Sequence, residues 1–516
     1  MTQEIELNLS PRQAYNDESV RAEAAKAALI PVSNVSHCKV LRRSVDARKR
    51  DIRVLLRVRI SDDSQYQAPA ITFGYRDVSQ SRPVIIVGAG PAGMFAATRL
   101  IQQGIKPIVL ERGKDVSARK RDIAQLYRTQ IVDPESNFCF GEGGAGTFSD
   151  GKLYTRSKKR GDIQRVLEEF VHHGAKDEIL IDVHPHIGSN LLPTIMANMR
   201  KCIIEHGGEV HFNTKVTDIH TQFDQFTGVS TQTGETFSAK AMILATGHSA
   251  RDIYELLHRK GITIEAKAFA MGVRIEHPQF IIDRIQYHNS PDIEFLPPAS
   301  YSVVEQVRDR GVYSFCMCPG GIIVPAASAG NESVVNGMSN ATRNSPFANS
   351  GIAVEIRVED MQAYAEHGPL AGMEMQRQLE QMARVNGGRG LTAPAQRLND
   401  FVRGRISQDL PAYSYMPGAE CSPLHFWLPE HIGTRLQEGF SAFGHKMRGY
   451  FTNEAVLLGV ESRTSSPVRI PRDKDTFQHI QIQGLFPCGE GAGYAGGIVS
   501  SAMDGQQCAD MAAQQA

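Results

Sequence analysis

A glycine-rich segment near residue 90 has the spacing of a loop that binds a dinucleotide. It reads Gly88-Ala89-Gly90-Pro91-Ala92-Gly93 and directly follows the apolar run at 84–87. In this pattern the first glycine allows a tight turn, the second lets the backbone approach a diphosphate, and the third lets a helix pack closely on a strand. Glu111 ends the next apolar run, 18 residues after Gly93, where a carboxylate would accept hydrogen bonds from a ribose.

Two further segments in the first half of the chain could extend this site. The glycine-rich loop at 141–152 would give backbone N–H groups access to an anion or to a flat ring. The alternative for this loop is a flexible surface segment. Ala245-Thr246-Gly247 ends a later apolar run, and its small residues would let the chain lie against a nucleotide without a clash.

The end of the chain decides between a nicotinamide and a flavin dinucleotide. The segment 485–497 repeats the glycine spacing, but only 19 residues follow it, too few for a second dinucleotide fold. We expect Glu490 to contact the ribityl hydroxyls of a flavin instead. A helix that begins near Gly497 and Ile498 would direct its positive end at the flavin N1–C2=O edge and stabilise negative charge on the reduced ring.

Several other polar residues could take part in catalysis. Cys316 and Cys318 could be thiols that relay electrons to the flavin or form an adduct with its ring. The alternative is that they are two small buried residues before a turn. The segment 463–469, which ends at Arg469, could line a cavity for an anionic substrate or form a solvated loop. The cluster at 274–277 could hold an acid or a base, or a satisfied salt bridge.

The region between Lys39 and Arg59 is strongly basic. It holds nine basic residues against Asp46 and Asp51. This excess could contact a phosphate backbone, as a flavoprotein that modifies RNA would need. The alternative is a solvated strand face, or a face paired with acids of the FAD domain. The basic residues are Lys39, Arg42, Arg43, Arg48, Lys49, Arg50, Arg53, Arg57 and Arg59.

These motifs resemble the FAD-binding fold of the glutathione reductase type. More closely, the chain resembles a family of uncharacterised bacterial FAD-dependent (NAD(FAD)-utilising) dehydrogenases with a small N-terminal α+β domain. The matching segments are 43–49, 149–153, 271–278, 316–321 and 489–497. The resemblance implies a non-covalent FAD and an oxidoreductase whose substrate the family does not define. Many members of the broader fold have Asp where Glu490 stands.

The motifs and the resemblance together imply the residues of the site. We expect FAD contacts from Gly88, Gly90, Pro91, Ala92, Gly93, Glu111, Arg112, Gly143, Gly144, Ser149, Asp150, Gly151, Lys152, Val216, Ala245, Thr246, Gly247, Gly489, Glu490, Gly497 and Ile498. The catalytic candidates are Cys316, Cys318 and Arg469. His184 and His186 have no companions at metal-ligand spacing, so no metal site is predicted. The chain shows no active-site CxxC pair and no separate nicotinamide domain, so any NAD(P)H would bind transiently.

The elements that position these residues predict an α/β protein. We expect a doubly wound, Rossmann-like FAD-binding domain built from discontinuous segments, 81–265 and 455–516. A mixed α+β substrate domain would be inserted at 266–454. Residues 1–80 would form a ferredoxin-like α+β domain, whose strand at 52–60 alternates apolar and polar residues.

Composition excludes several other classes. Lys and Arg number 56 and so do Asp and Glu, so the chain is neither a wholly basic nucleic-acid binder nor an acidic, disordered protein. The eight cysteines form no paired framework, which is typical of reduced thiols in the cytoplasm. No apolar run is long enough to span a membrane. We therefore expect a cytoplasmic FAD-dependent oxidoreductase acting on a small molecule; the alternatives are the RNA-modifying flavoprotein and a non-catalytic, FAD-binding regulatory protein.

Overall fold

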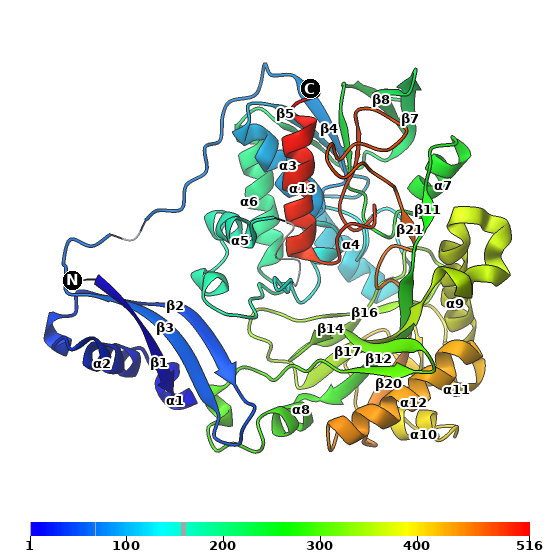
Figure 1. Cartoon of the computed structure of the whole chain (residues 1–516). Helices are drawn as coiled ribbons and strands as arrows, with labels where there is room; N and C mark the ends of the chain where they lie inside the picture. The colour runs from blue at the N-terminus through cyan, green and yellow to red at the C-terminus, as the bar shows by residue number, and fades with distance from the viewer. Residues whose placement is uncertain (1, 68, 156–160) are drawn as a thin grey trace.

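The computed structural model describes residues 2–67, 69–155 and 161–516 (Figure 1). Its N-terminal part forms an antiparallel sheet in the order β1-β3-β2, and α1 and α2 lie between β1 and β2 in the chain. Strand β3 alternates buried and more exposed residues, as the apolar pattern predicts. The elements are β1 (Thr2–Leu9), α1 (Pro11–Ala14), α2 (Asp17–Ala28), β2 (His37–Asp46) and β3 (Arg53–Ser61).

A parallel sheet in the order β22-β10-β4-β5-β6 forms the centre of the molecule. Strands β5 and β6 follow β4 in the chain and lie on one side of it. Strands β10 and β22 come later in the chain and lie on the other side, so the strand order reverses between β4 and β10. Strand β4 is apolar throughout because both of its faces are covered: Ile86 joins one hydrophobic cluster and Ile85 another. The strands are β4 (Pro83–Val87), β5 (Lys106–Leu110), β6 (Glu209–His211), β10 (Met242–Leu244) and β22 (Leu485–Pro487).

Helices from both ends of the chain cover one face of this sheet. The C-terminal helix α13 lies beside α3, with α6 and α5 next to them (Figure 1). The approach of α13 to α3 requires glycine, because a Cβ on Gly505 would lie 2.1 Å from the carbonyl oxygen of Ala92. These helices are α3 (Pro91–Gln102), α5 (Ile163–His172), α6 (Leu192–Glu205) and α13 (Ile498–Ala512).

The opposite face of the parallel sheet is covered by an antiparallel meander and α7, which share a hydrophobic cluster with Ile85 and Val87. The meander consists of β7 (Val216–Gln222), β8 (Gln225–Thr231) and β9 (Thr236–Ser238), and α7 spans Arg251–Arg259. Helix α4 (Val116–Thr129) follows β5 in the chain.

A second, mostly antiparallel sheet lies beside the first, in the order β13-β14-β17-β12-β20-β18-β19. Helix α12 packs on one face through residues such as Phe440 and Phe443. The strands are β12 (Phe269–Pro278), β13 (Val304–Val307), β14 (Arg310–Cys318), β17 (Phe347–Ile356), β18 (Ala393–Arg397), β19 (Ala419–Cys421) and β20 (Val456–Glu461). The associated helices are α8 (Gln279–Gln286), α9 (Ala371–Asn386), α10 (Leu398–Val402), α11 (Leu424–Trp427) and α12 (Glu430–Lys446).

The structure changes one boundary that the sequence predicts. The sequence assigns residues from 455 onward to the FAD domain, because an apolar strand pattern and a glycine-rich loop return there. In the structure β20 instead pairs antiparallel with β12 and β18 in the second sheet, where it is fully buried. The chain returns to the parallel sheet only at β22. Two small pairs, β11 (Glu265–Ala266) with β21 (Val468–Arg469) and β15 (Ile322–Pro325) with β16 (Val335–Met338), complete the strands.

Within the described ranges, no helix has the length and apolar character needed to cross a bilayer.

Candidate functional site

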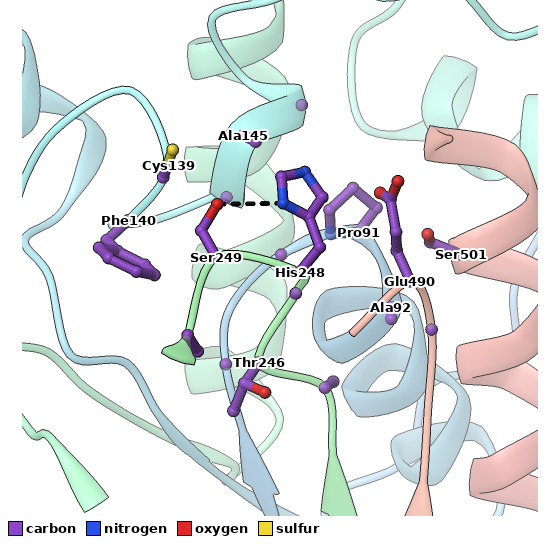
Figure 2. A pocket seen from close by; sticks show the side chains of 18 of the residues that line it. Pro91, Ala92, Cys139, Phe140, Ala145, Thr246, His248, Ser249, Glu490 and Ser501 are labelled. Carbon is purple, nitrogen blue, oxygen red and sulfur yellow. Dashed lines mark hydrogen bonds between the residues drawn. The ribbon is translucent and has the colours of Figure 1, made fainter. Parts of the chain in front are cut away.

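A pocket lies at the carboxyl ends of β4, β5, β10 and β22, where the order of the parallel strands reverses (Figure 2). Doubly wound sheets bind their ligands at this edge. Nineteen of the twenty-one residues expected to contact FAD line the pocket. The other two, Gly93 and Gly143, lie just behind the wall: a Cβ on Gly93 would lie 1.9 Å from the carbonyl oxygen of Gly88, and the N–H of Gly143 donates to the carbonyl oxygen of Ala89.

The glycines of the pocket fit a dinucleotide that lies against the backbone. Among the described residues, an added Cβ at Gly90 would meet the Cα of Gly144, at 3.9 Å, and no other atom within 4 Å. At Gly247 and Gly497 no atom of a described residue outside the chain neighbours lies within 4 Å of an added Cβ. Since Gly90 has ordinary extended backbone angles, its lack of a side chain is explained by space for a ligand rather than by its conformation.

Helix α3 begins at this space. Gly90 is its N-cap residue, with no side-chain hydrogen bond to the first turn, and Pro91 is its first residue. The unpaired N–H groups and the positive end of the dipole therefore face the pocket, which is a favourable place for a diphosphate. The close approach of Gly144 to Gly90 places the second glycine-rich loop against this helix end.

Glu111 organises the loops around the pocket in addition to lining it. Its carboxylate accepts backbone hydrogen bonds from Ala89, Gly113 and Gly141, at 2.8, 2.9 and 3.0 Å. The side chain is 5 % exposed. A carboxylate has about four acceptor positions, so one remains for the ribose contact that the sequence predicts.

The loop at 141–152 is fixed by buried charges and is therefore not a flexible surface segment. Arg119 is fully buried and donates to the carbonyl oxygens of Asn137, Phe138 and Glu142. The carboxylate of Glu142 accepts the N–H of Val116 and pairs with Arg200 at 3.0 Å. Further along the loop, buried Asp150 pairs with Arg343 at 2.6 Å. These contacts hold the loop against α4 and α6.

Glu490 faces the pocket from the loop between β22 and α13, close to Pro91 and Ser501 (Figure 2). Burial raises the pKa of its carboxyl to about 7, and the nearby Lys267 only partly opposes this effect. Within the described part of the chain, its side chain makes no hydrogen bond or ion pair. The carboxyl is thus available for a ligand with hydroxyl groups, as the ribityl prediction requires.

Residues that the sequence did not single out also line the pocket. His248 and Ser249 follow directly after Gly247, and the imidazole Nδ1 lies 3.0 Å from the Ser249 Oγ (Figure 2). Burial and the charges of Arg463 and Arg251 lower the pKa of His248 to about 4, so the ring is neutral at neutral pH. Cys139 and Phe140 contribute to the same wall. The position of His248 directly after the Ala-Thr-Gly triplet is the one signal that could have identified it.

The two thiols of β14 lie in different environments. The ladder with β17 is irregular between Phe315 and Cys318, and Cys316 has a φ of +47°. Cys316 lines the pocket, whereas Cys318 is fully buried and its thiol donates to the carbonyl oxygen of Cys316. A hydrogen bond from Cys318 lowers the pKa of Cys316, and Lys152 and Arg274 contribute in the same direction.

The polar side chains of the cluster at 274–277 contact other parts of the protein interior, although the buried Nδ1 of His277 has no hydrogen-bond partner among the described residues. Arg274 pairs with Glu461 at 2.8 Å, and both side chains are buried. Glu276 accepts the N–H of Ser414, and the imidazole of His277 lies 2.8 Å from the carbonyl oxygen of Tyr450. Of the two alternatives for this cluster, the structure therefore favours the salt bridge over an acid or base.

The segment at 463–469 contributes its first arginine to the pocket rather than its last. Arg463 lines the wall and pairs with Glu332 at 2.6 Å and Glu380 at 3.0 Å. Arg469 is exposed on β21, and its guanidinium lies over the ring of Tyr494, outside the residues that line the pocket. The expectation that Arg469 acts on a substrate thus has no geometric support.

Six of the nine basic residues between Lys39 and Arg59 are ion-paired. Four pairs lie within the N-terminal part: Arg48 with Asp46, Arg53 with Asp51, Arg57 with Glu6 and Arg59 with Glu4. Two reach the FAD-binding part: Lys39 with Asp177 and Arg43 with Asp182. The pairs of Lys39 and Arg43 match the predicted pairing with acids of the FAD domain, whereas the other four form within the N-terminal part. RNA binding stays a prediction, and the pairs reduce its electrostatic basis.

A second cavity, of about 670 Å³, adjoins the pocket. The two spaces share part of their walls, which come from the glycine-rich loop, β14 and the start of α13. The shared residues are Lys152, Tyr154, Cys316, Gly496, Gly497 and Ile498.

Several family models match the chain. The model described as FAD-dependent protein, C-terminal domain-like, matches 268–464. An FAD binding domain matches 81–131, a flavin containing amine oxidoreductase 125–258 and an FAD dependent oxidoreductase 193–333. A domain of unknown function matches 1–61.

Among solved structures, the chain is similar to glycine oxidase from Bacillus cereus, with 12 % identity over 84 % of this chain and 96 % of that chain and a TM-score of 0.32. It is similar to the flavin-dependent brominase Bmp2, with 14 % identity over 84 % and 78 % and a TM-score of 0.35.

An uncharacterized protein of Clostridium beijerinckii is 41 % identical over 499 residues, which cover 92 % of each chain. Identity at this level over nearly the whole length shows common family membership, and the family models identify FAD as the cofactor. The chain belongs to a family of FAD-dependent oxidoreductases that includes this Clostridium protein.

Proposed function

We propose that the protein is a dehydrogenase or reductase that transfers a hydride between FAD and a small-molecule substrate in the second cavity. The observation that carries the proposal is the wall shared by the FAD pocket and this cavity, which includes Lys152, Cys316 and Ile498. A volume of about 670 Å³ is within the range of sites for small molecules. FAD, when bound, supplies a two-electron acceptor or donor.

The residues of the chain would contribute binding, orientation and electrostatics. The amino end of α3 would hold the diphosphate, and Glu111 would hold the ribose. Glu490 would contact the ribityl chain. The amino end of α13 begins on the shared wall and provides a partial positive charge there. Cys316 is the one thiol of its pair that borders both spaces, which supports it over Cys318 as a group close to the substrate.

We propose that NADH or NADPH, if it is the electron partner, binds only during turnover. Within the described residues a single parallel sheet carries a glycine-rich first turn, and this sheet holds the FAD pocket. A resident nicotinamide dinucleotide would require a second site of this kind.

The hydride-transfer proposal is tested by anaerobic spectroscopy of the purified, FAD-loaded protein. NADH, NADPH and a panel of metabolites are added in turn, and the visible absorption of the flavin is recorded. At least one compound should bleach it, and dithionite provides the control for a reducible flavin. If dithionite bleaches the flavin and no other compound does, hydride transfer is contradicted and the regulatory alternative is favoured.

The position of the cofactor is tested by Gly90→Glu. The new carboxylate would occupy the space beside Gly144 and repel the diphosphate, so purified protein should hold at least about tenfold less FAD. Gly330→Glu, the same change at an exposed glycine with open space around it, is the control and should remain yellow. A folded Gly90→Glu protein with a full complement of FAD would show that the diphosphate binds elsewhere.

A further inference from the structure

We propose that the second cavity binds the carboxylate group of its substrate and that the ammonium group of Lys152 is the partner of this carboxylate. The inference rests on the proposed function, because it names the chemical class of the substrate that the FAD-dependent reaction would use.

The first observation is the charge of the cavity wall. Lys152 and Arg343 both line it, together with the hydroxyl-bearing residues Ser300, Ser302 and Ser314, and no aspartate or glutamate among the described residues does so. Burial and Arg343 lower the pKa of His184, so this imidazole is neutral at neutral pH. The wall therefore combines cations with hydroxyl groups, which suits an anion.

The second observation is that Arg343 and Lys152 share one carboxylate, that of Asp150, and that Arg343 is the one that forms an ion pair with it. The guanidinium of Arg343 pairs with Asp150 at 2.6 Å, and the two side chains are 12 % and 1 % exposed. The ammonium of Lys152 has neither an ion pair nor a hydrogen bond to any other described residue. Asp150 attracts Lys152 as well as Arg343, but one carboxylate beside two cations leaves one net positive charge. One net positive charge matches a monoanion, such as a carboxylate, better than it matches a phosphate dianion.

The third observation is the position of Lys152. Its main chain is held in an isolated bridge to His186, and the neighbouring Leu153 N–H donates to the carbonyl oxygen of Pro185. The side chain borders both the FAD pocket and the second cavity. A carboxylate bound there would hold the rest of the substrate near the shared wall, where α13 begins with its partial positive charge.

One other group on the shared wall could compensate Lys152. The Cys316 thiol borders the same two spaces, and its pKa is lowered by Cys318, with a contribution from Lys152. A thiolate there would compete with a substrate carboxylate for the ammonium group. The experiment must therefore separate these two partners.

Benzoate serves as the probe, and benzamide as a neutral molecule of nearly the same shape. Each is titrated into the FAD-loaded full-length protein, and binding is followed by calorimetry and by the visible spectrum of the flavin. Benzoate should bind saturably, and benzamide at least about tenfold more weakly, as expected when a charge-assisted hydrogen bond is lost. Equal binding of the two probes, or no binding of benzoate, would overturn the proposal.

Variants then assign the effect to Lys152. Lys152→Met should weaken benzoate binding about tenfold or more, and Lys152→Arg should restore most of it because the charge is kept. Lys120→Met, an exposed lysine of α4, is the matched control and should bind benzoate as the wild type does. The FAD content of each variant is measured in parallel. Loss of FAD in Lys152→Met would mean that Lys152 serves the cofactor, and would overturn the proposal.

Cys316→Ser separates the carboxylate from the thiolate. Benzoate binding that is present in the wild type and retained in Cys316→Ser supports the proposal. Benzoate binding that occurs only in Cys316→Ser would identify the thiolate as the partner of Lys152 and overturn it.

The failure of this inference can be distinguished from the failure of the proposed function. If a neutral compound bleaches the flavin while benzoate does not bind, hydride transfer stands and the carboxylate site is wrong. If benzoate binds through Lys152 but no compound other than dithionite reduces the flavin, the carboxylate site stands and hydride transfer is wrong.

Discussion

Glu380 on α9 shows how individual buried charges support the pocket. It is completely buried, pairs with Arg251 at 2.9 Å and Arg463 at 3.0 Å, and accepts a hydrogen bond from Ser462. Arg463 in turn lines the FAD pocket. Burial would raise the pKa of Glu380, but Arg463 and Arg251 outweigh this effect and hold the pKa below its ordinary value. The carboxylate thus keeps a pocket-lining arginine in place.

At the residue scale, Glu380→Gln should lower the free energy of unfolding by about 3 kcal/mol at neutral pH, because it leaves buried guanidinium groups with less compensation. Urea denaturation measures the loss. Because the folded-state pKa lies below the unfolded one, the carboxylate stabilises the protein above the ordinary carboxyl pKa, and this contribution is lost as the pH falls. The difference between wild type and variant should therefore shrink on acidification.

Glu235→Gln is the control for this prediction, since Glu235 is exposed in a turn. Its free energy of unfolding should stay within about 0.5 kcal/mol of the wild type. A Glu380→Gln protein as stable as this control would contradict the assigned role of Glu380.

At the scale of elements, the turn between β4 and α3 depends on the packing of the helix against the turn before it. A Cβ on Gly93 would lie 1.9 Å from the carbonyl oxygen of Gly88 and 3.2 Å from the Cγ2 of Ile86. Since one of these atoms belongs to the backbone, a rotamer change cannot relieve the clash. The third glycine of the motif is therefore needed to position the helix, although it does not line the pocket.

Gly93→Ala should destabilise the protein by about 2 kcal/mol or more, as overpacking of a buried site does, and should lower FAD retention because α3 shifts. Thermal unfolding and the absorbance ratio of FAD to protein measure the two effects. Gly74→Ala is the matched control, because no atom lies within 4 Å of a Cβ at that exposed position. Equal behaviour of the two variants would show that α3 does not depend on the close contact.

At the scale of the whole molecule, the N-terminal part contacts the rest of the chain at several places, among them the buried Ile52, which joins the hydrophobic cluster of the second sheet, and Arg43. Figure 1 shows it beside the main body, joined to β4 by an extended connection. Arg43 makes two backbone hydrogen bonds across this interface: its N–H donates to the carbonyl oxygen of Ile181, and its carbonyl oxygen accepts the N–H of Val183. Its side chain pairs with Asp182 at 3.2 Å. No residue from 1–61 lines the FAD pocket, as far as the described residues show.

Arg43→Ala should loosen this attachment without loss of FAD. Hydrogen exchange measured by mass spectrometry should become faster in β2 and around Val183, while the FAD content stays at the wild-type level. Arg50→Ala, an exposed arginine in the turn after β2, serves as the control and should leave both measurements unchanged. Loss of FAD in Arg43→Ala would show that the N-terminal part supports the cofactor site directly.

Short-range patterns along the chain are sufficient to predict several parts of this protein. The glycine spacing after β4, Glu111 at the end of β5 and the loop before α13 predicted the FAD site, because tight turns and helix ends require particular residues at fixed distances along the chain. The tertiary structure decided what depends on long-range packing. It placed β20 in the second sheet, paired Arg463 with Glu380, gave Cys316 and Cys318 different surroundings through the irregular ladder with β17, and paired Arg57 and Arg59 with acids of β1. Such contacts join residues far apart in the chain, and no local pattern specifies which charge meets which partner.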